Sequence, residues 1–256
     1  MNFFHSLVLG VVEGVTEFLP ISSTGHLIIA SKLLNLNPNE FLKSFEIAIQ
    51  LGAILSIVFL YFKTFLKNFV ILKRLFIAFL PTALIGLILY KTIKKYFIGN
   101  GMVVLISLFI GGILLILFEK IHEEKSEATE NLEDISYKQS FIIGIFQSIA
   151  IIPGVSRAAA TIVGGLILGL KRKTIVEFSF LLAVPTMLAA TGFDLIKNAG
   201  SFSSDQFGLL AVGFITSFIV AIFAIKFLLK FIQNHSFTPF GIYRVVVGII
   251  LWLIIF

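Results

Sequence analysis

Two glutamates, two serines and a histidine lie close together near the start of the chain, in a stretch that is otherwise apolar. They are Glu13, Glu17, Ser22, Ser23 and His26. Carboxylates, hydroxyls and an imidazole are the groups from which metal sites, nucleophiles and proton carriers are built. Ionisable groups at membrane depth are costly and are functional candidates by default. The stretch therefore predicts a reactive site.

Glu13 and Glu17 are four residues apart, so on a helix their carboxylates share one face, about 6 Å from each other. At that spacing the two charges repel unless a cation or a shared proton intervenes. Together they can hold Mg²⁺ or Ca²⁺ along with the phosphate oxygens of a substrate. Glu17 can instead orient His26, and the non-catalytic alternative is a capping or interhelical hydrogen bond.

His26 follows Ser22 by four residues and Ser23 by three, so all three lie on neighbouring faces of a helix. A hydroxyl beside an imidazole can be an activated nucleophile. The imidazole can also transfer protons or attack phosphorus itself. Ser22, Ser23, His26 and water all stay open as the attacking group, and a simple hydrogen-bonding role for His26 is the alternative.

A second polar motif, Pro153-Gly-Val-Ser156-Arg157-Ala-Ala-Ala-Thr161, lies in the other half of the chain. A Pro-Gly break followed by serine predicts a helix start, whose free N–H groups and positive dipole end suit a phosphate. Arg157 adds a planar fork for phosphate oxygens, and Thr161 is one turn later on the same face. Alternatively Arg157 pairs with a glutamate to stabilise the fold, and the two roles are compatible.

The composition is that of a membrane protein. Of 256 residues, 58% are hydrophobic and 13% are charged, with a mean hydropathy of +1.04. A soluble domain carries roughly twice that charge. There are no cysteines, which excludes disulfides and thiolate metal sites. The net charge of +6 lies mostly in short loops, which is typical of topogenic charge and not of a nucleic-acid surface.

The elements that position the two motifs are two broken hydrophobic segments, residues 1–36 and 139–170. Pro20 and Pro153-Gly154 interrupt them, so each predicts a re-entrant helical hairpin about half the membrane deep. The polar, acidic segment 119–138 predicts a soluble linker. About six transmembrane helices are expected, at residues 41–62, 75–90, 102–118, 174–196, 207–230 and 239–256.

The two halves of the chain, residues 1–118 and 139–256, repeat each other within a single membrane domain. Gly10-Val-Val-Glu13 parallels Gly144-Ile-Phe-Gln147, and a serine follows nine residues later in each half. An odd number of spans separates the hairpins, which predicts inverted-topology repeats with a site near the midplane. The expected fold is an all-α polytopic membrane protein.

The remaining charged residues have plainer interpretations. Lys171, Arg172 and Lys173 are expected to be topogenic, and Tyr243-Arg244 to anchor the last span at the membrane interface. Glu46 and Glu177 are interpreted as polar contacts related by the repeat. The distribution of lysine and arginine favours a cytoplasmic location for loops 63–74, 119–138 and 171–173, with both termini on the other side.

Both motifs together resemble the signatures of the undecaprenyl-diphosphate phosphatases of the bacitracin-resistance type, and the resemblance covers essentially the whole chain. One departure is that Ala158 and Ala159 replace a serine and a glycine of the family's second motif. A role for a hydroxyl at position 158 is therefore in doubt, whereas Ser156, Arg157 and Thr161 match.

The resemblance implies hydrolysis of a C55 prenyl diphosphate to the monophosphate and inorganic phosphate. It also implies an inner-membrane location, a divalent cation, an active site open to the periplasm and a homodimer among membrane lipids. Recycling of the lipid carrier for peptidoglycan synthesis, and bacitracin resistance, would follow from that activity.

Two other classes compete with a phosphatase. A transporter or lipid flippase uses inverted repeats with broken helices and needs charges only to bind its substrate. His26 beside paired hydroxyls and paired carboxylates distinguishes an enzyme, because transport does not require that combination. A structural subunit would leave the buried charges without a purpose.

Overall fold

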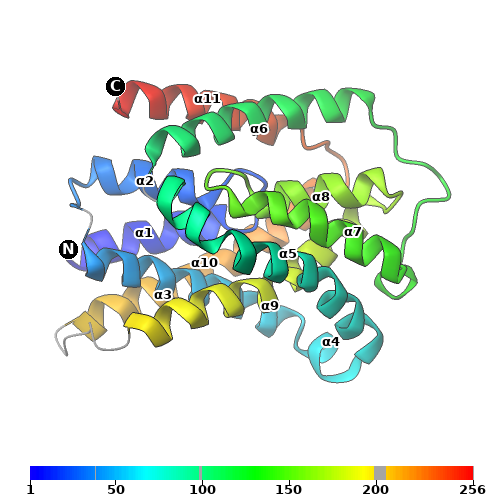
Figure 1. The fold of residues 1–256 in the computed structure, drawn as a ribbon, viewed down its shortest axis with the longest axis horizontal. Helices are drawn as coiled ribbons and strands as arrows, with labels where there is room; N and C mark the ends of the chain where they lie inside the picture. The colour runs from blue at the N-terminus through cyan, green and yellow to red at the C-terminus, as the bar shows by residue number, and fades with distance from the viewer. Residues whose placement is uncertain (38, 98–99, 199–205, 256) are drawn as a thin grey trace.

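The computed structural model describes residues 1–37, 39–97, 100–198 and 206–255, and among them the regular elements are helices (Figure 1). The helices are α1 (Phe3–Thr16), α2 (Ser23–Leu33), α3 (Glu40–Leu60), α4 (Phe62–Lys67), α5 (Phe69–Tyr96), α6 (Gly101–Ile121), α7 (Tyr137–Ser148), α8 (Arg157–Ile167), α9 (Arg172–Asn198), α10 (Phe207–Phe231) and α11 (Thr238–Ile255). Two short 3₁₀ turns, η1 (Leu132–Asp134) and η2 (Ile149–Ile151), complete them.

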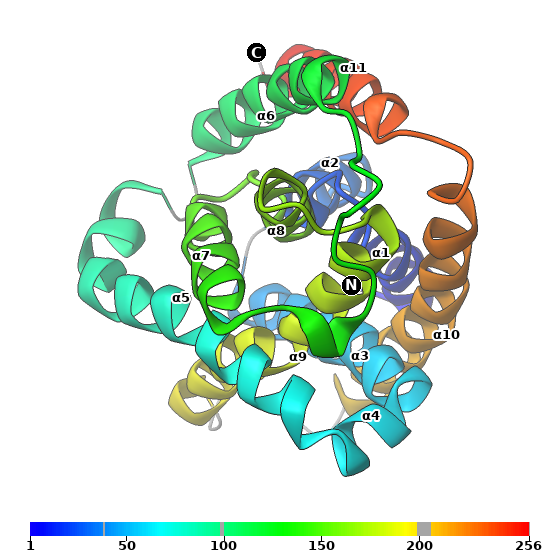
Figure 2. The same ribbon diagram turned by 90° about the vertical axis from the view of Figure 1, so that its right-hand side faces the viewer.

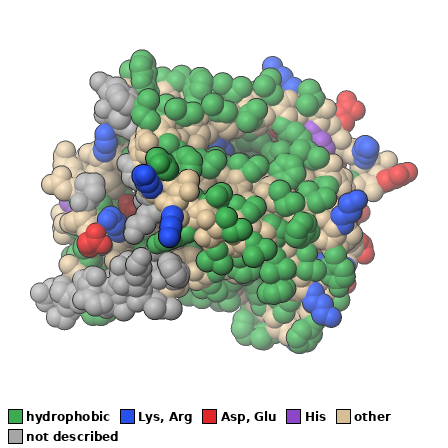
Figure 3. Space-filling model, viewed as in Figure 1, with side chains coloured by type: hydrophobic (Ala, Val, Ile, Leu, Met, Phe, Trp, Pro, Cys, Tyr) green, Lys and Arg blue, Asp and Glu red, His purple; other side chains and the backbone are tan. Residues whose placement is uncertain are grey.

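Five of these helices, α3, α5, α6, α9 and α10, are long and apolar enough to cross a membrane. The sixth expected span, α11, is shorter, and it packs along α6. Hydrophobic side chains cover the middle of the face in Figure 3, and charged side chains lie mainly toward its ends. The expectation of an all-α polytopic membrane protein is confirmed.

Both expected breaks are present. α1 ends at Thr16 and α2 begins at Ser23, so residues 17–22 form the turn around Pro20. In the second half, η2 and the segment 152–156 separate α7 from α8. A turn this long cannot continue the i→i−4 hydrogen bonds of a helix, so each segment is two short helices and not one span.

Asparagine and serine caps fix where several helices begin. The side chains of Asn2, Asn39, Asn68 and Asn100 accept hydrogen bonds from backbone N–H groups in the first turns of α1, α3, α5 and α6. Ser136 forms a capping box at the start of α7. Each cap satisfies donors that would otherwise be left without partners.

One span is longer than expected. The sequence predicted residues 75–90, whereas α5 begins at Phe69 and contains Lys73 and Arg74 within its first two turns. The cap at Asn68 accounts for this earlier start, because its side chain accepts the backbone N–H of Ile71 at 3.1 Å.

Corresponding helices of the two halves pack in corresponding ways. α1 packs against α10 and α7 against α5, while α3 contacts α9 and α6 contacts α11. Gly10 and Gly144 allow the close approaches, since a Cβ atom on either would collide with a backbone carbonyl of the facing helix, that of Gly213 or Ala78. A two-fold relation between the two halves would give this pattern of helix contacts. The division of the chain into residues 1–118 and 139–256 stays a prediction.

The two short helices α2 and α8 lie near the middle when the molecule is viewed end on (Figure 2). The α6–α11 pair lies on one side of them, and α3 and α9 lie on the other. In Figure 1 both termini are toward one end of the molecule, and α4 is at the other. The hairpins are thus enclosed by longer helices, which is the surrounding that irregular backbone needs inside a membrane.

The segment 119–138 is more ordered than the expected linker. α6 continues into it as far as Ile121, and the Glu119 side chain is only 1% exposed. Arg172 binds Glu119 at 2.5 Å and lies 3.7 Å from Glu124, so it stabilises the start of α9. The topogenic interpretation of residues 171–173 missed this ion pair, because it connects positions more than fifty residues apart.

Candidate active site

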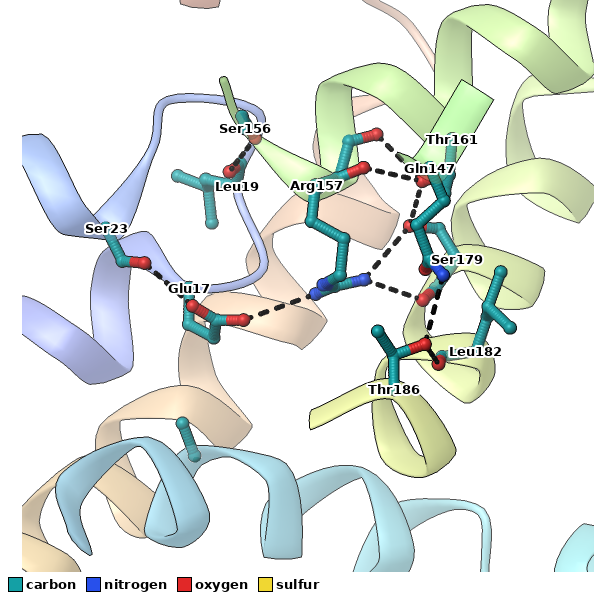
Figure 4. Close-up of polar contacts among 12 residues, drawn as sticks. Glu17, Leu19, Ser23, Gln147, Ser156, Arg157, Thr161, Ser179, Leu182 and Thr186 are labelled. Carbon is teal, nitrogen blue, oxygen red and sulfur yellow. Dashed lines mark hydrogen bonds and ion pairs between the residues drawn. The ribbon is translucent and has the colours of Figure 1, made fainter. Parts of the chain in front are cut away.

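The two hairpins meet at an ion pair between their polar residues. Arg157, the first residue of α8, donates from Nη2 to Oε1 of Glu17 at 3.4 Å, and its Nη1 donates to the Ser179 carbonyl at 2.9 Å (Figure 4). The side chains of Arg157 and Glu17 are 9% and 5% exposed. Burial strengthens such a pair electrostatically, and removal of one partner would leave an uncompensated charge.

Glu17 also accepts a hydrogen bond from Ser23. The Ser23 hydroxyl donates to Oε2 of Glu17 at 2.7 Å, a short distance typical of a bond to a charged acceptor. Glu17 is the residue that follows α1, and Ser23 is the first residue of α2, so the turn around Pro20 folds one onto the other. A hydroxyl held against a carboxylate is the arrangement of an activated nucleophile with its base.

The hydrogen-bond partners of His26 differ from the one that we expected. Its Nδ1 contacts the Ser22 carbonyl at 2.8 Å and its Nε2 contacts the Tyr243 hydroxyl at 2.9 Å. Glu17 does not orient His26, because the carboxylate is engaged by Ser23 and Arg157 instead. The imidazole lies one turn of α2 beyond Ser23 and is half-buried.

Ser22 is the residue of the turn whose backbone conformation is strained. Its φ is +70°, in the left-handed region that residues other than glycine rarely adopt, and its side chain makes no capping bond. By its position before α2, Ser22 could have capped the helix with its side chain. Ser22 instead supplies its backbone carbonyl to His26, so its main-chain conformation positions the imidazole.

Ser156 and Thr161 stabilise the first turn of α8, where Arg157 lies. The Ser156 hydroxyl accepts the N–H of Ala159 at 3.2 Å and so caps α8, which begins after the Pro-Gly break as predicted. Thr161 is fully buried, and its hydroxyl bonds Ser179 at 2.6 Å and the carbonyl of Arg157 at 3.0 Å. These contacts link Thr161 to the start of α8, and its direct binding of phosphate stays a prediction.

Glu13 is a buried carboxylate beside Glu17. It is fully buried, and neither carboxylate oxygen has a hydrogen-bond partner among the described residues. Glu13 lies near enough to Glu17 and Glu46 for electrostatic interaction. A buried carboxylate without partners demands a proton or a cation, so these residues fit a divalent ion bound by two carboxylates and by substrate oxygens. No cluster of three or more metal-ligating side chains is found in the described part of the chain.

Arg244 connects the hairpins to α6, which the sequence did not reveal. It is 1% exposed, and its guanidinium donates to the carbonyls of Pro20, Gly154, Ser107 and Leu108 at 3.1–3.4 Å. Its five donors suit several carbonyls at once. The interpretation of Tyr243-Arg244 as an interface anchor was wrong for Arg244. The sequence did contain a signal for its burial, because an arginine within an apolar span usually faces the protein interior.

Comparison with known proteins gives a consistent result. Residues 6–250 match the family model described as "Bacitracin resistance protein BacA". The chain is 54% identical over 253 residues to an undecaprenyl-diphosphatase of Sulfurihydrogenibium sp., covering 99% of both chains. It is 50% identical to that of Aquifex aeolicus, covering 98% of this chain and 97% of the relative, and 49% identical to that of Persephonella marina over the full length of both.

Proposed function

The chain belongs to the bacitracin resistance protein BacA family, and from this we propose that Ser23, Glu17 and Arg157 form the catalytic centre of an undecaprenyl-diphosphatase. It is an integral membrane hydrolase that acts on undecaprenyl diphosphate, releasing inorganic phosphate and the lipid monophosphate. This activity recycles the lipid carrier for peptidoglycan synthesis and underlies bacitracin resistance. The observation that carries the proposal is the contact of one Glu17 carboxylate with both the Ser23 hydroxyl and Arg157.

In the first step the Ser23 oxygen attacks the terminal phosphorus of the diphosphate. The bond from phosphorus to the bridging oxygen breaks, the lipid monophosphate leaves, and the Ser23 proton passes to Glu17. Arg157 neutralises charge on the phosphate oxygens, which is the main requirement of phosphoryl transfer. The N-terminus of α8, which begins at Arg157, supports the same oxygens through its dipole.

In the second step water attacks the phosphoserine. The bond between phosphorus and Ser23 breaks, and Glu17 returns its proton to the serine oxygen. His26 takes the proton of the attacking water and passes it to solvent. Both ring nitrogens of His26 have hydrogen-bond partners in this structure, which favours a positioned proton carrier over an attacking nucleophile for this residue.

A divalent cation, Mg²⁺ or Ca²⁺, would be held by Glu13 and Glu17. It would supply charge neutralisation to the diphosphate, as cations commonly do in phosphoryl transfer. The support is the buried Glu13 carboxylate, whose oxygens have no partner among the described residues. We place the site toward the periplasmic face of the inner membrane, in a homodimer, on the basis of loop charge and of the family.

Phosphate release tests the function. The purified protein is expected to liberate one phosphate from each undecaprenyl diphosphate and to leave undecaprenyl phosphate. EDTA should abolish release, and added Mg²⁺ or Ca²⁺ should restore it. Turnover unaffected by EDTA would exclude the cation while leaving the hydrolase assignment intact, whereas translocation of the lipid without phosphate release would favour the flippase.

Arg157→Lys is expected to lower turnover about 10- to 100-fold although the positive charge is kept. A lysine ammonium cannot present the planar fork that contacts Glu17 and Ser179 at once, and each bond to a charged group contributes about 1.5–3 kcal/mol. The measurement is steady-state phosphate release, with thermal unfolding as the control for folding. Wild-type turnover in a folded Arg157→Lys protein would exclude Arg157 from the phosphate site.

A further inference from the structure

Tyr243 makes two contacts with the imidazole of His26. Its hydroxyl lies 2.9 Å from Nε2, and the two rings are stacked, 4° from parallel with centroids 5.5 Å apart. The residues are 217 positions apart in the chain, one near the start of α11 and the other on α2. The stack restricts the tilt of the imidazole, and the hydroxyl restricts its rotation.

The hydrogen bond to the Ser22 carbonyl determines the tautomer of His26. A backbone carbonyl can only accept, so Nδ1, which contacts the Ser22 carbonyl at 2.8 Å, must carry a proton. In the neutral ring Nε2 then has the lone pair and accepts from the Tyr243 hydroxyl. When the ring is protonated, the same hydroxyl can turn and accept from Nε2, because a phenol both donates and accepts. The Tyr243 hydroxyl can therefore hydrogen-bond to Nε2 in both protonation states of His26.

The position of Tyr243 is itself fixed by its neighbour. Arg244 is buried and bonds to the carbonyls of Pro20 and Gly154, one from the turn of each hairpin. This arrangement holds the start of α11 against the hairpin turns. Tyr243 as a residue is nevertheless 43% exposed, and its ring contacts His26.

We infer that Tyr243 is a positioning residue for the reaction: the Ser22 carbonyl sets the Nδ1–H form of His26, and the Tyr243 hydroxyl holds Nε2, the nitrogen that exchanges protons, in a fixed orientation. This inference rests on the proposed role of His26 as proton carrier. Tyr243 makes no hydrogen bond to Glu17, Ser23 or Arg157, and it lies near the opposite end of the sequence from His26.

The variant that isolates the hydroxyl is Tyr243→Phe, because it keeps the stacked ring. We expect kcat to fall about three- to tenfold, which is the value of one neutral hydrogen bond. KM should stay within about twofold, since the hydroxyl is assigned no contact with the substrate. Tyr137→Phe is the matched control, because the Tyr137 ring contacts Arg74 through its face and Phe preserves that ring. It should behave as wild type.

Nitrogen NMR supplies a readout that a merely structural role would not move. The chain has four histidines, and the signals of His26 are assigned from their absence in His26→Gln. In the wild-type protein the neutral ring should carry its proton on Nδ1. In Tyr243→Phe the Nε2 signal should shift because its hydrogen bond to the tyrosine hydroxyl is lost, while the proton stays on Nδ1 and the melting temperature stays close to that of the wild type.

The inference requires both changes together. A kcat loss without a shift of the Nε2 signal, a shift of that signal without a kcat loss, or neither, would overturn it. A rise in KM with unchanged kcat would overturn it too, because the hydroxyl would then be a substrate contact. Failure of the wild-type protein to release phosphate would instead reject the proposed function, and the spectra would still report the contact, because they need no substrate.

Discussion

Ser23→Ala is expected to lower phosphate release at least about a thousandfold, because loss of an attacking nucleophile typically removes most of the catalysis in enzymes that use one. Ser23 is the hydroxyl that donates to Glu17, at 2.7 Å. Alanine keeps the helix start and removes only the oxygen. The measurement is turnover of purified protein with undecaprenyl diphosphate, alongside a trapping experiment with label in the terminal phosphate.

The trapping experiment distinguishes attack by Ser23 from attack by water. Rapid denaturation of the wild-type protein during turnover should leave labelled phosphate on Ser23, and Ser23→Ala should carry none. Thr24→Ala is the control, because Thr24 is the adjacent hydroxyl and is exposed. Near wild-type turnover in Ser23→Ala would disprove the nucleophile assignment.

His26→Ala is the second change with a large expected effect, a loss of about 10²–10⁴ in rate, as is usual when a general acid–base group is removed. The imidazole is one turn of α2 beyond Ser23, and both of its nitrogens are held in place. Without it, no positioned group takes the proton of the attacking water. Labelled phosphoserine should therefore accumulate in His26→Ala, since the first step is left intact.

His235→Ala is the matched control for this experiment. His235 is exposed between α10 and α11, where its ring stacks on Phe231, and it is remote from the hairpins in sequence. Its replacement should leave turnover unchanged. If His26→Ala released phosphate at the wild-type rate, a proton-carrier role for His26 would have to be abandoned. If it hydrolysed slowly without accumulating phosphoserine, the assignment to the second step would be wrong.

Much of the fold could be predicted from local sequence. Long apolar runs identify spans because a membrane helix must be hydrophobic over about twenty residues. Pro20 and the Pro153-Gly154 pair identify the two breaks, since proline cannot continue a helix. Spacing alone also placed Glu13 beside Glu17, because residues four apart share one face of a helix.

What the sequence determined by itself was therefore the class of protein, the two broken segments and the polar residues within each of them. Only the tertiary structure decided which of those residues meet: Arg157 with Glu17, and His26 with Tyr243, across 140 and 217 positions. It also decided that Arg244 bonds to the turns of both hairpins. The physical reason is that hydropathy and helix breaks are properties of neighbouring residues, whereas the partner of a buried charge depends on how separate helices pack.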